Sequence, residues 1–195
     1  MTSPAPTLVK PARVLGKHIV MRDARPDDAE FIVGLRTDPA KGRYLSATSP
    51  DVAAQRAWLE AYARDDSQVY FIIEDRDGTR HGTVRLYDPQ GASFSWGSWI
   101  LADGRPSGFA VESALMVYAY ALQLGFTASH FSVRVGNESV WKFHERFGAT
   151  RTGQAGEDLF YSISEDAIRA SFDKYRKYLP DGITVVPRAP DGAAA

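Results

Sequence analysis

The chain has 195 residues, of which 44% are hydrophobic and 24% are charged, and its 23 Lys and Arg nearly balance its 24 Asp and Glu. A formal net charge of −1 excludes a nucleic-acid binder held mainly by phosphate contacts, because such a protein needs a marked basic excess. Cysteine is absent, which excludes thiol catalysis and disulfides, and with four scattered histidines we expect no metal site.

The ends of the chain differ in composition from its middle. We expect a flexible arm at residues 1–17, where prolines recur without an apolar period, and a disordered tail at 181–195, rich in Pro, Gly and Ala. Between them, 18–164 predicts one domain and 165–180 a C-terminal helix. The chain has no apolar run of about 18 residues and no basic-then-apolar leader, so we expect no membrane partner and no secretion. A cysteine-free chain suits the reducing cytoplasm, and a homodimer stays open.

Apolar periodicity and turn residues divide the domain into short elements. Asp77-Gly78 is typical of a hairpin turn, and Gly125 and Gly148 are typical of helix ends. In chain order the pattern predicts a strand at 18–21, helices at 25–38 and 49–62, strands at 69–74, 81–87 and 94–101, a helix at 109–124, a strand at 130–135, a helix at 137–147, a strand at 159–163 and a helix from 164 onward. The order β-α-α-β-β-β-α-β-α-β predicts an α/β fold, a mixed sheet with helices on its faces.

The stretch Arg105-Pro-Ser-Gly-Phe-Ala110 lies where a strand gives way to a long helix. A helix N-terminus leaves backbone N–H groups unpaired and carries partial positive charge, and a glycine there allows a phosphate to approach the backbone. The arginine in front adds a charged contact. The stretch therefore indicates an anion cradle for a pyrophosphate; the alternative is an ordinary helix start after a flexible turn.

A second pattern runs from Asn137 to Gly148, with His144 and Arg146 between them. An Arg-x-x-Gly-x-Ala stretch that opens a helix, followed some thirty residues later by Asn, a Tyr or His at +7, a basic residue at +9 and Gly at +11, resembles the two signatures of the GCN5-related N-acetyltransferases, the GNAT family. The predicted element order is also similar to that fold, over about residues 18–163. The resemblance implies a mostly antiparallel sheet with helices on both faces.

The resemblance also implies a cosubstrate and its binding residues. Acetyl-CoA would lie between two central strands that splay apart, and a primary amine of a small molecule would attack the thioester directly, without an acyl-enzyme. Asn137 would cap its helix and touch the pantetheine arm. The pyrophosphate would bind to the loop formed by Arg105, Ser107, Gly108, Phe109 and Ala110.

His144 occupies the position where many relatives place a tyrosine that protonates the departing thiolate. An imidazole can act as a general acid near neutral pH. The alternative is a packed core residue, since His144 shares a helical face with Val140 and Phe147. No general base is singled out by spacing, and the candidates are Glu74, His81, Asp88 and Glu112.

The acceptor is the least determined part of the site. Trp96 and Trp99 lie three apart on a predicted strand, so we expect them to face opposite sides of the sheet, one toward the acceptor. Stretches at 35–46, 82–87 and 96–99 are similar to a branch that acetylates nucleotide-linked amino sugars, and Arg36, Arg43 and Arg85 could pair with a diphosphate or a carboxylate. The alternatives are an acetyltransferase acting on protein N-termini and a non-catalytic acyl-CoA-binding domain.

Overall fold

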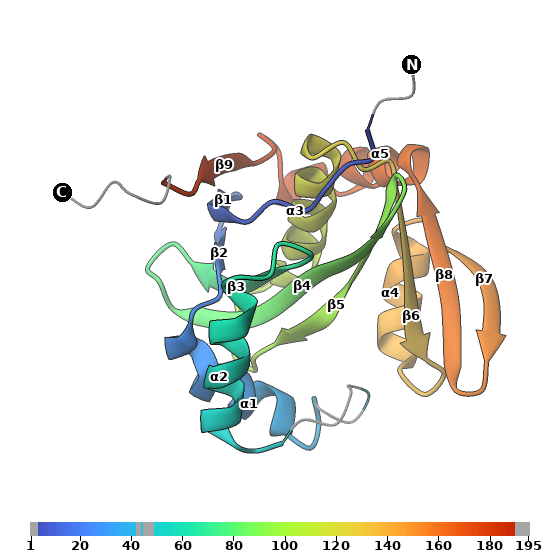
Figure 1. Ribbon diagram of the computed structural model, residues 1–195. Helices are drawn as coiled ribbons and strands as arrows, with labels where there is room; N and C mark the ends of the chain where they lie inside the picture. The colour runs from blue at the N-terminus through green and yellow to red at the C-terminus, as the bar shows by residue number, and fades with distance from the viewer. Residues whose placement is uncertain (1–3, 42–43, 45–48, 190–195) are drawn as a thin grey trace.

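The computed structural model describes residues 4–41, 44 and 49–189. Within these ranges the chain forms one nine-stranded sheet with five α-helices packed on it (Figure 1). The strands are β1 (Pro11–Leu15), β2 (Ile19–Asp23), β3 (Val69–Asp75), β4 (Arg80–Gln90), β5 (Ser93–Leu101), β6 (Ala128–Arg134), β7 (Thr150–Ala155), β8 (Asp158–Ser164) and β9 (Thr184–Pro187). The helices are α1 (Ala29–Thr37), α2 (Val52–Tyr62), α3 (Phe109–Gln123), α4 (Glu138–Arg146) and α5 (Glu165–Lys174), with short 3-10 turns at Pro26–Asp28 and Arg176–Tyr178.

The strands lie in the order β7-β8-β6-β5-β4-β3-β2-β1-β9. Neighbouring strands are antiparallel except β5 and β6, which run parallel. This confirms the mixed, mostly antiparallel α/β sheet. Each element predicted from the sequence is present, and β1, β7 and β9 are additional. None of the described helices is long and apolar enough to cross a bilayer.

Both faces of the sheet are covered, as alternation along β3 shows. Val69, Phe71 and Ile73 belong to the larger core, which includes α3 and side chains of α4 and α5. Tyr70 and Ile72, on the opposite face, pack with α1 and α2 in a second cluster. Because a strand buried on both sides shows no polar alternation, the apolar run 69–73 reads as a central strand. Figure 1 shows α1 and α2 on one face and α3 and α4 on the other.

Both ends of the chain contribute strands, so the expectation of a flexible arm at 1–17 and a disordered tail at 181–195 is wrong for these segments. β1 pairs with β2 on one side and with β9 on the other. Leu8 is 5% exposed, and the Lys10 ammonium donates to the Tyr62 carbonyl at 2.6 Å. The sequence signal was weak because each strand is short, and its pairing partner lies far away along the chain. Residues 1–3 and 190–195 lie outside the described ranges.

The sheet opens between β5 and β6. These two strands pair only where they begin, at Ser93 with Ala128 and at Phe94 with Ser129. Beyond that point each strand keeps its other neighbour, β4 for β5 and β8 for β6. Figure 1 shows the two strands diverging. The splay leaves a gap in the middle of the sheet, and the cavity described next lies there.

Candidate active site

A β-bulge in β5 shapes one side of the gap. Arg85 on β4 is opposite Gly97 and Thr83 is opposite Ile100, so Ser98 and Trp99 together face Val84. Ser98 has a φ of 46°, a backbone conformation uncommon for residues other than glycine. The extra residue breaks the alternation of side chains along the strand. Trp96 and Trp99 therefore lie on the same side, with ring centroids 5.4 Å apart, and the expectation of opposite faces is wrong.

The two tryptophans are fixed by α3. The Trp96 indole N–H donates to the Tyr118 hydroxyl at 3.3 Å, and the Trp99 indole N–H donates to Ser113 Oγ at 3.2 Å. Both acceptors are buried on α3. Because each indole has its polar atom satisfied within the protein, both rings present apolar surface to the gap.

His144 on α4 closes this group of rings. Its imidazole centroid lies 4.3 Å from that of Phe131 and 5.0 Å from that of Trp96. The side chain is 5% exposed, and its Nδ1 atom is buried without a hydrogen-bond partner. Burial lowers the pKa of His144 to about 3. The ring is therefore neutral at pH 7 in the free protein, and it lacks the imidazolium proton that the predicted general-acid role requires.

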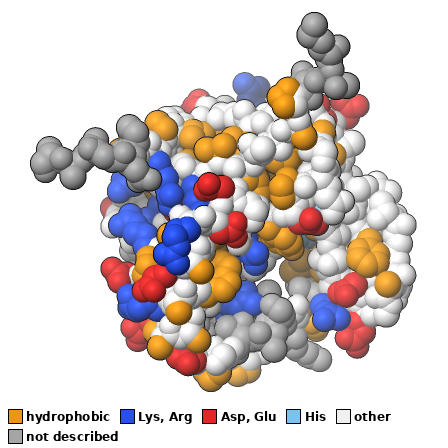
Figure 2. Space-filling view, viewed as in Figure 1, with side chains coloured by type: hydrophobic (Ala, Val, Ile, Leu, Met, Phe, Trp, Pro, Cys, Tyr) orange, Lys and Arg blue, Asp and Glu red, His pale blue; other side chains and the backbone are white. Residues whose placement is uncertain are grey.

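A cavity of about 390 Å³ occupies the gap. Its lining includes Trp96, Trp99, Phe131 and His144 from the side of α3 and α4. From the side of α1 and α2 it includes Arg36, Arg85 and Tyr87. We call this cavity the through-sheet groove, because its walls come from both faces of the sheet. In Figure 2 the visible face is hollowed between the part that carries α1 and α2 and the part that carries β6 to β8.

A second cavity, of about 400 Å³, adjoins the first at the start of α3. Trp99, Asn137 and Val140 line both cavities, so the two form neighbouring parts of one cleft. Of the residues predicted to hold the pyrophosphate, Arg105 and Ala110 line this cofactor-side cavity.

The other predicted loop residues lie elsewhere. Phe109 is 2% exposed and belongs to the core, with its ring against that of His81. Ser107 and Gly108 are not among the lining residues. Gly108 has a φ of 90°, and a Cβ there would lie 2.8 Å from the ring of Tyr178. Glycine is therefore required here by the backbone and by a C-terminal side chain, whether or not a phosphate binds.

The beginning of α3 suits an anion. Glu112 N–H bonds to the Gly108 carbonyl at 2.9 Å and closes the first helical turn. The N–H groups that precede it in the first turn have no acceptor within the helix. Ala110, whose side chain lines the cofactor-side cavity, belongs to this turn. Partial positive charge at this end of a fifteen-residue helix favours a bound phosphate.

Asn137 is the N-cap residue of α4, as the sequence predicts, but its side chain makes no capping hydrogen bond. The expected side-chain cap is therefore wrong. Asn137 lines both cavities. Gly148, with a φ of 97°, ends α4 as predicted.

The four candidate bases named from the sequence all make other contacts. Glu74 pairs with Arg22 at 2.7 Å, and His81 bonds to Asp75 at 2.8 Å. Asp88 lies 3.2 Å from His130. Glu112 is buried and accepts hydrogen bonds from the backbone N–H groups of His18 and Ile19. None of the four is a lining residue of either cavity.

Asp158 is the carboxylate that lines the through-sheet groove among the described residues. It begins β8, one residue before the buried Leu159, so its side chain points to the face that carries α1 and α2. Arg134 Nε lies 3.5 Å from Asp158 Oδ1, so the two side chains form an ion pair. Asp158 is not among the residues predicted from the sequence, because no local pattern marks it and only the splay of β5 and β6 opens the cavity beside it.

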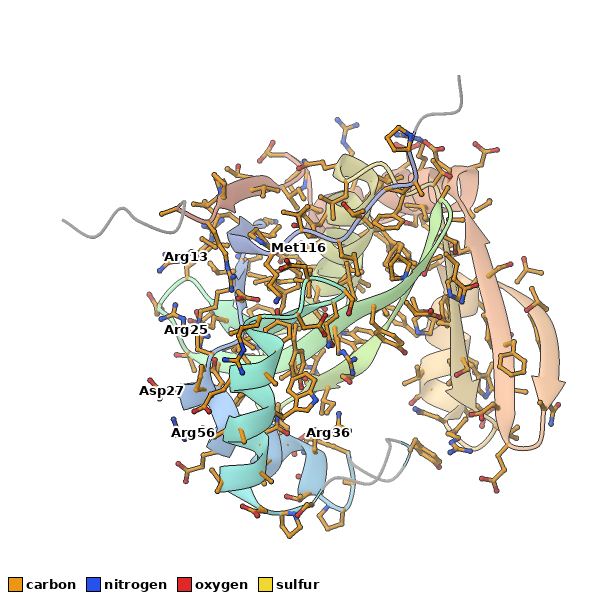
Figure 3. The ribbon with its side chains drawn as sticks, in the orientation of Figure 1. Arg13, Arg25, Asp27, Arg36, Arg56 and Met116 are labelled. Atoms are coloured by element: carbon orange, nitrogen blue, oxygen red, sulfur yellow. The ribbon has the colours of Figure 1, made fainter. Side chains whose placement is uncertain are left out.

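Two of the three arginines proposed for the acceptor lie together. Arg85 points away from the core of α3, since its neighbours Val84 and Leu86 are in that core. Arg36 extends from α1 and donates to Ser98 Oγ at 3.3 Å. Figure 3 shows Arg36 on the side of α1 that faces the gap. Arg43 lies outside the described residues.

Comparisons with known proteins give the family. The model of the acetyltransferase (GNAT) domain matches residues 18–150, more than half of the chain. The chain belongs to the GNAT acetyltransferases. The solved apo structure of FdhC, a nucleotide-linked sugar GNAT, is 34% identical with a TM-score of 0.75, covering 89% of this chain and 99% of that one.

Two more distant GNAT structures share the fold. A GCN5-related N-acetyltransferase from Brucella melitensis is 17% identical with a TM-score of 0.74, covering 93% of this chain and 92% of that one. A spermidine N-acetyltransferase from Vibrio cholerae, in complex with CoA and spermine, is 17% identical with a TM-score of 0.69, covering 78% and 98%. A search of curated proteins gives no significant match.

Proposed function

We propose that this GNAT acetyltransferase transfers the acetyl group of acetyl-CoA to a primary amine of a nucleotide-linked amino sugar. The observation that carries the proposal is the through-sheet groove, apolar on the side of α4 and lined by guanidinium groups on the side of α1. The 34% identity with FdhC, which is a nucleotide-linked sugar GNAT, supports the same acceptor class.

Acetyl-CoA would bind along the cofactor-side cavity. Its pyrophosphate would accept hydrogen bonds from the first turn of α3 near Ala110 and from the guanidinium of Arg105. The pantetheine arm would then pass Asn137, which lines both cavities, and bring the thioester to the ring cluster. The apolar walls formed by Trp99 and Val140 would exclude water from the thioester.

The reaction requires the acceptor nitrogen to lose two protons and the thiolate to leave. The ammonium loses its first proton, the free amine attacks the thioester carbon, and the C–S bond breaks as the nitrogen gives its second proton to solvent and the CoA thiolate leaves. Asp158 would accept the amine proton, since it is the carboxylate of the groove. His144, neutral at pH 7, would form part of the wall around the acyl end, and the thiolate would take its proton from solvent.

The charge of the groove argues against the other acceptors considered. Arg36 and Arg85 would repel a polyamine, which carries several positive charges. A protein N-terminus would favour an open acidic groove, whereas Asp158 is paired with Arg134. The non-catalytic alternative lacks a usable acid and base, and Asp158, which lines the groove, is the candidate base that argues against it.

Release of free thiol from acetyl-CoA tests the proposal. The panel holds nucleotide-linked amino sugars, the same amino sugars without the nucleotide, spermidine, and peptides with free N-termini. We expect nucleotide-linked amino sugars to give the highest kcat/KM, by at least about tenfold over the free sugars. Equal or higher kcat/KM for spermidine or a peptide would overturn the proposal.

A further inference from the structure

The guanidinium of Arg85 is held in an unusual way for a cation. Its Cζ lies 4.9 Å from the ring centroid of Tyr87 and 5.5 Å from that of Trp58, so two aromatic rings contact it. Its Nε atom is buried and has no hydrogen-bond partner. No described carboxylate forms an ion pair with it. A partly desolvated cation without an anion is unfavourable unless a ligand supplies the charge.

The backbone fixes this arrangement in advance. Tyr87 lies across Gly97 on the neighbouring strand, where a Cβ would be 3.1 Å from the Tyr87 hydroxyl. Gly97 is also the residue directly opposite Arg85, immediately before the β-bulge. The absent side chain therefore gives room for the tyrosine ring, and the ring holds one side of the guanidinium. A preorganised guanidinium loses little conformational entropy when it binds an anion.

A second arginine reinforces the charge. Arg36 also lines the through-sheet groove. Burial lowers the pKa of Arg85, and the nearby positive charge of Arg36 acts in the same direction. Two arginines at one wall match an anion with several oxygen atoms, such as a diphosphate, better than a single carboxylate. The nearest groove carboxylate described, Asp158, lies across the gap on β8.

We infer that Arg85, assisted by Arg36, forms a diphosphate subsite for the acceptor on the α1 side of the groove. The inference rests on the proposed function and adds the residues that select the acceptor. It also gives the acceptor a direction: the diphosphate lies on the β4 wall, and the sugar amine points across the gap toward Asp158. A diphosphate has a second source, the pyrophosphate of CoA, which we assign to Arg105 and the start of α3.

Calorimetry with three probes, UDP, inorganic pyrophosphate and CoA, separates the two sources. Arg85→Gln keeps the length and polarity of the side chain and removes the charge. We expect it to weaken UDP and pyrophosphate binding by about tenfold or more, and to leave CoA binding within about twofold. Arg85→Lys keeps the charge but loses the planar fork, so its affinities should be intermediate.

Arg56→Gln is the matched control. Arg56 lies on the outer side of α2 (Figure 3) and pairs with Asp27 at 2.9 Å, outside both cavities. It should change none of the three affinities. UDP binding that is unaffected by Arg85→Gln in a variant of normal melting temperature would overturn the inference. So would UDP that competes with CoA, because it would then occupy the cofactor side.

The proposed function and the subsite can fail separately. If nucleotide-linked amino sugars are acetylated equally well by the wild type and by Arg85→Gln, the function stands and the subsite is refuted. If pyrophosphate binding depends on Arg85 but the preferred acceptor carries no nucleotide, the anion subsite stands and the acceptor class is refuted. Thiol release and calorimetry on the wild type and the three variants give both answers.

Discussion

The two faces of the sheet contribute opposite kinds of surface to one groove. On the side of α3 and α4 the wall is formed by aromatic rings and a neutral imidazole, with the indole N–H groups bound inside the protein. On the side of α1 and α2 it is formed by Arg36, Arg85 and the Tyr87 ring. The difference gives the groove an apolar wall and a charged wall, which meet at the gap between β5 and β6.

The largest expected effect comes from the carboxylate at that gap. Asp158→Asn should lower kcat by about a hundredfold or more, because a positioned base contributes about that much to proton removal. CoA affinity should stay unchanged, since Asp158 does not line the cofactor-side cavity. Steady-state kinetics and calorimetry measure the two quantities.

Asp88→Asn is the control for this change. Asp88 is also an aspartate on the sheet, pairs with His130, and has a φ of 50°, a conformation that asparagine adopts readily. Its kcat should remain near that of the wild type. If Asp158→Asn keeps the kcat of the wild type, Asp158 is not the group that accepts the amine proton.

The next effect concerns the cofactor end. Ala110→Asp places a carboxylate in the first turn of α3, where the helix dipole stabilises it, so the melting temperature should hold or rise. The same charge beside the expected pyrophosphate should weaken CoA binding by about tenfold. Ala110→Asn, similar in shape and neutral, should bind CoA more tightly than Ala110→Asp. Equal CoA affinity in the two variants would show that the pyrophosphate does not bind at this turn. Gly108 is a poorer site for this test, since any side chain there meets Tyr178.

The neutral imidazole gives a smaller effect that depends on pH. Because the pKa of His144 falls from 6.5 to about 3 on folding, the unfolded chain binds a proton between these values that the folded chain does not. Stability should therefore decrease as the pH falls from about 6.5 toward 3, by up to about 1.4 kcal/mol per pH unit for this one proton. His144→Phe should make the dependence of unfolding free energy on pH shallower over this window. An unchanged slope, together with a hundredfold loss of kcat at normal stability, would restore the acid role.

The smallest expected effect is on stability, and it concerns an ion pair outside the groove. Arg188, just after β9, pairs with Asp23 on β2, and its side chain is 45% exposed. Such a half-exposed ion pair contributes about 1 kcal/mol or less. Arg188→Ala should lower the unfolding free energy by that amount and leave kcat unchanged, as urea unfolding and thiol release would record. A lower kcat in Arg188→Ala would instead show that the ion pair between Arg188 and Asp23 affects the geometry of the groove.

The sequence predicted what depends on local patterns. Three features could be predicted because each depends on neighbouring residues. They are the apolar run of β3, the glycines that end α3 and α4, and the order of the elements. The two motifs likewise brought Arg105, Ala110, Asn137 and His144 to one cleft. Their roles remain proposals.

What the sequence missed depends on pairing between distant segments. The bulge at Ser98 is defined only by its register with β4, and it reversed the expected direction of Trp99. Asp158 reaches the groove because β8 pairs with β6 across from the gap. The pKa of His144 follows from rings on other elements, which a one-dimensional spacing rule does not contain.

The pairing of β1 with β9 places two segments from opposite ends of the sequence side by side at the edge of the sheet. Pro11 and Pro187 are cross-strand partners, but residues 4–10 run away from β9 and bury Leu8, so joining the chain ends requires a long linker (Figure 1). New ends could then be opened at the exposed β7–β8 turn, where Gly156 has a φ of 56° and no side chain is buried. A circular permutant of this kind should keep the groove, because the cut at Gly156 lies between β7 and β8 and breaks neither strand. The site would then depend on how the strands pair and not on the order in which they follow one another along the chain.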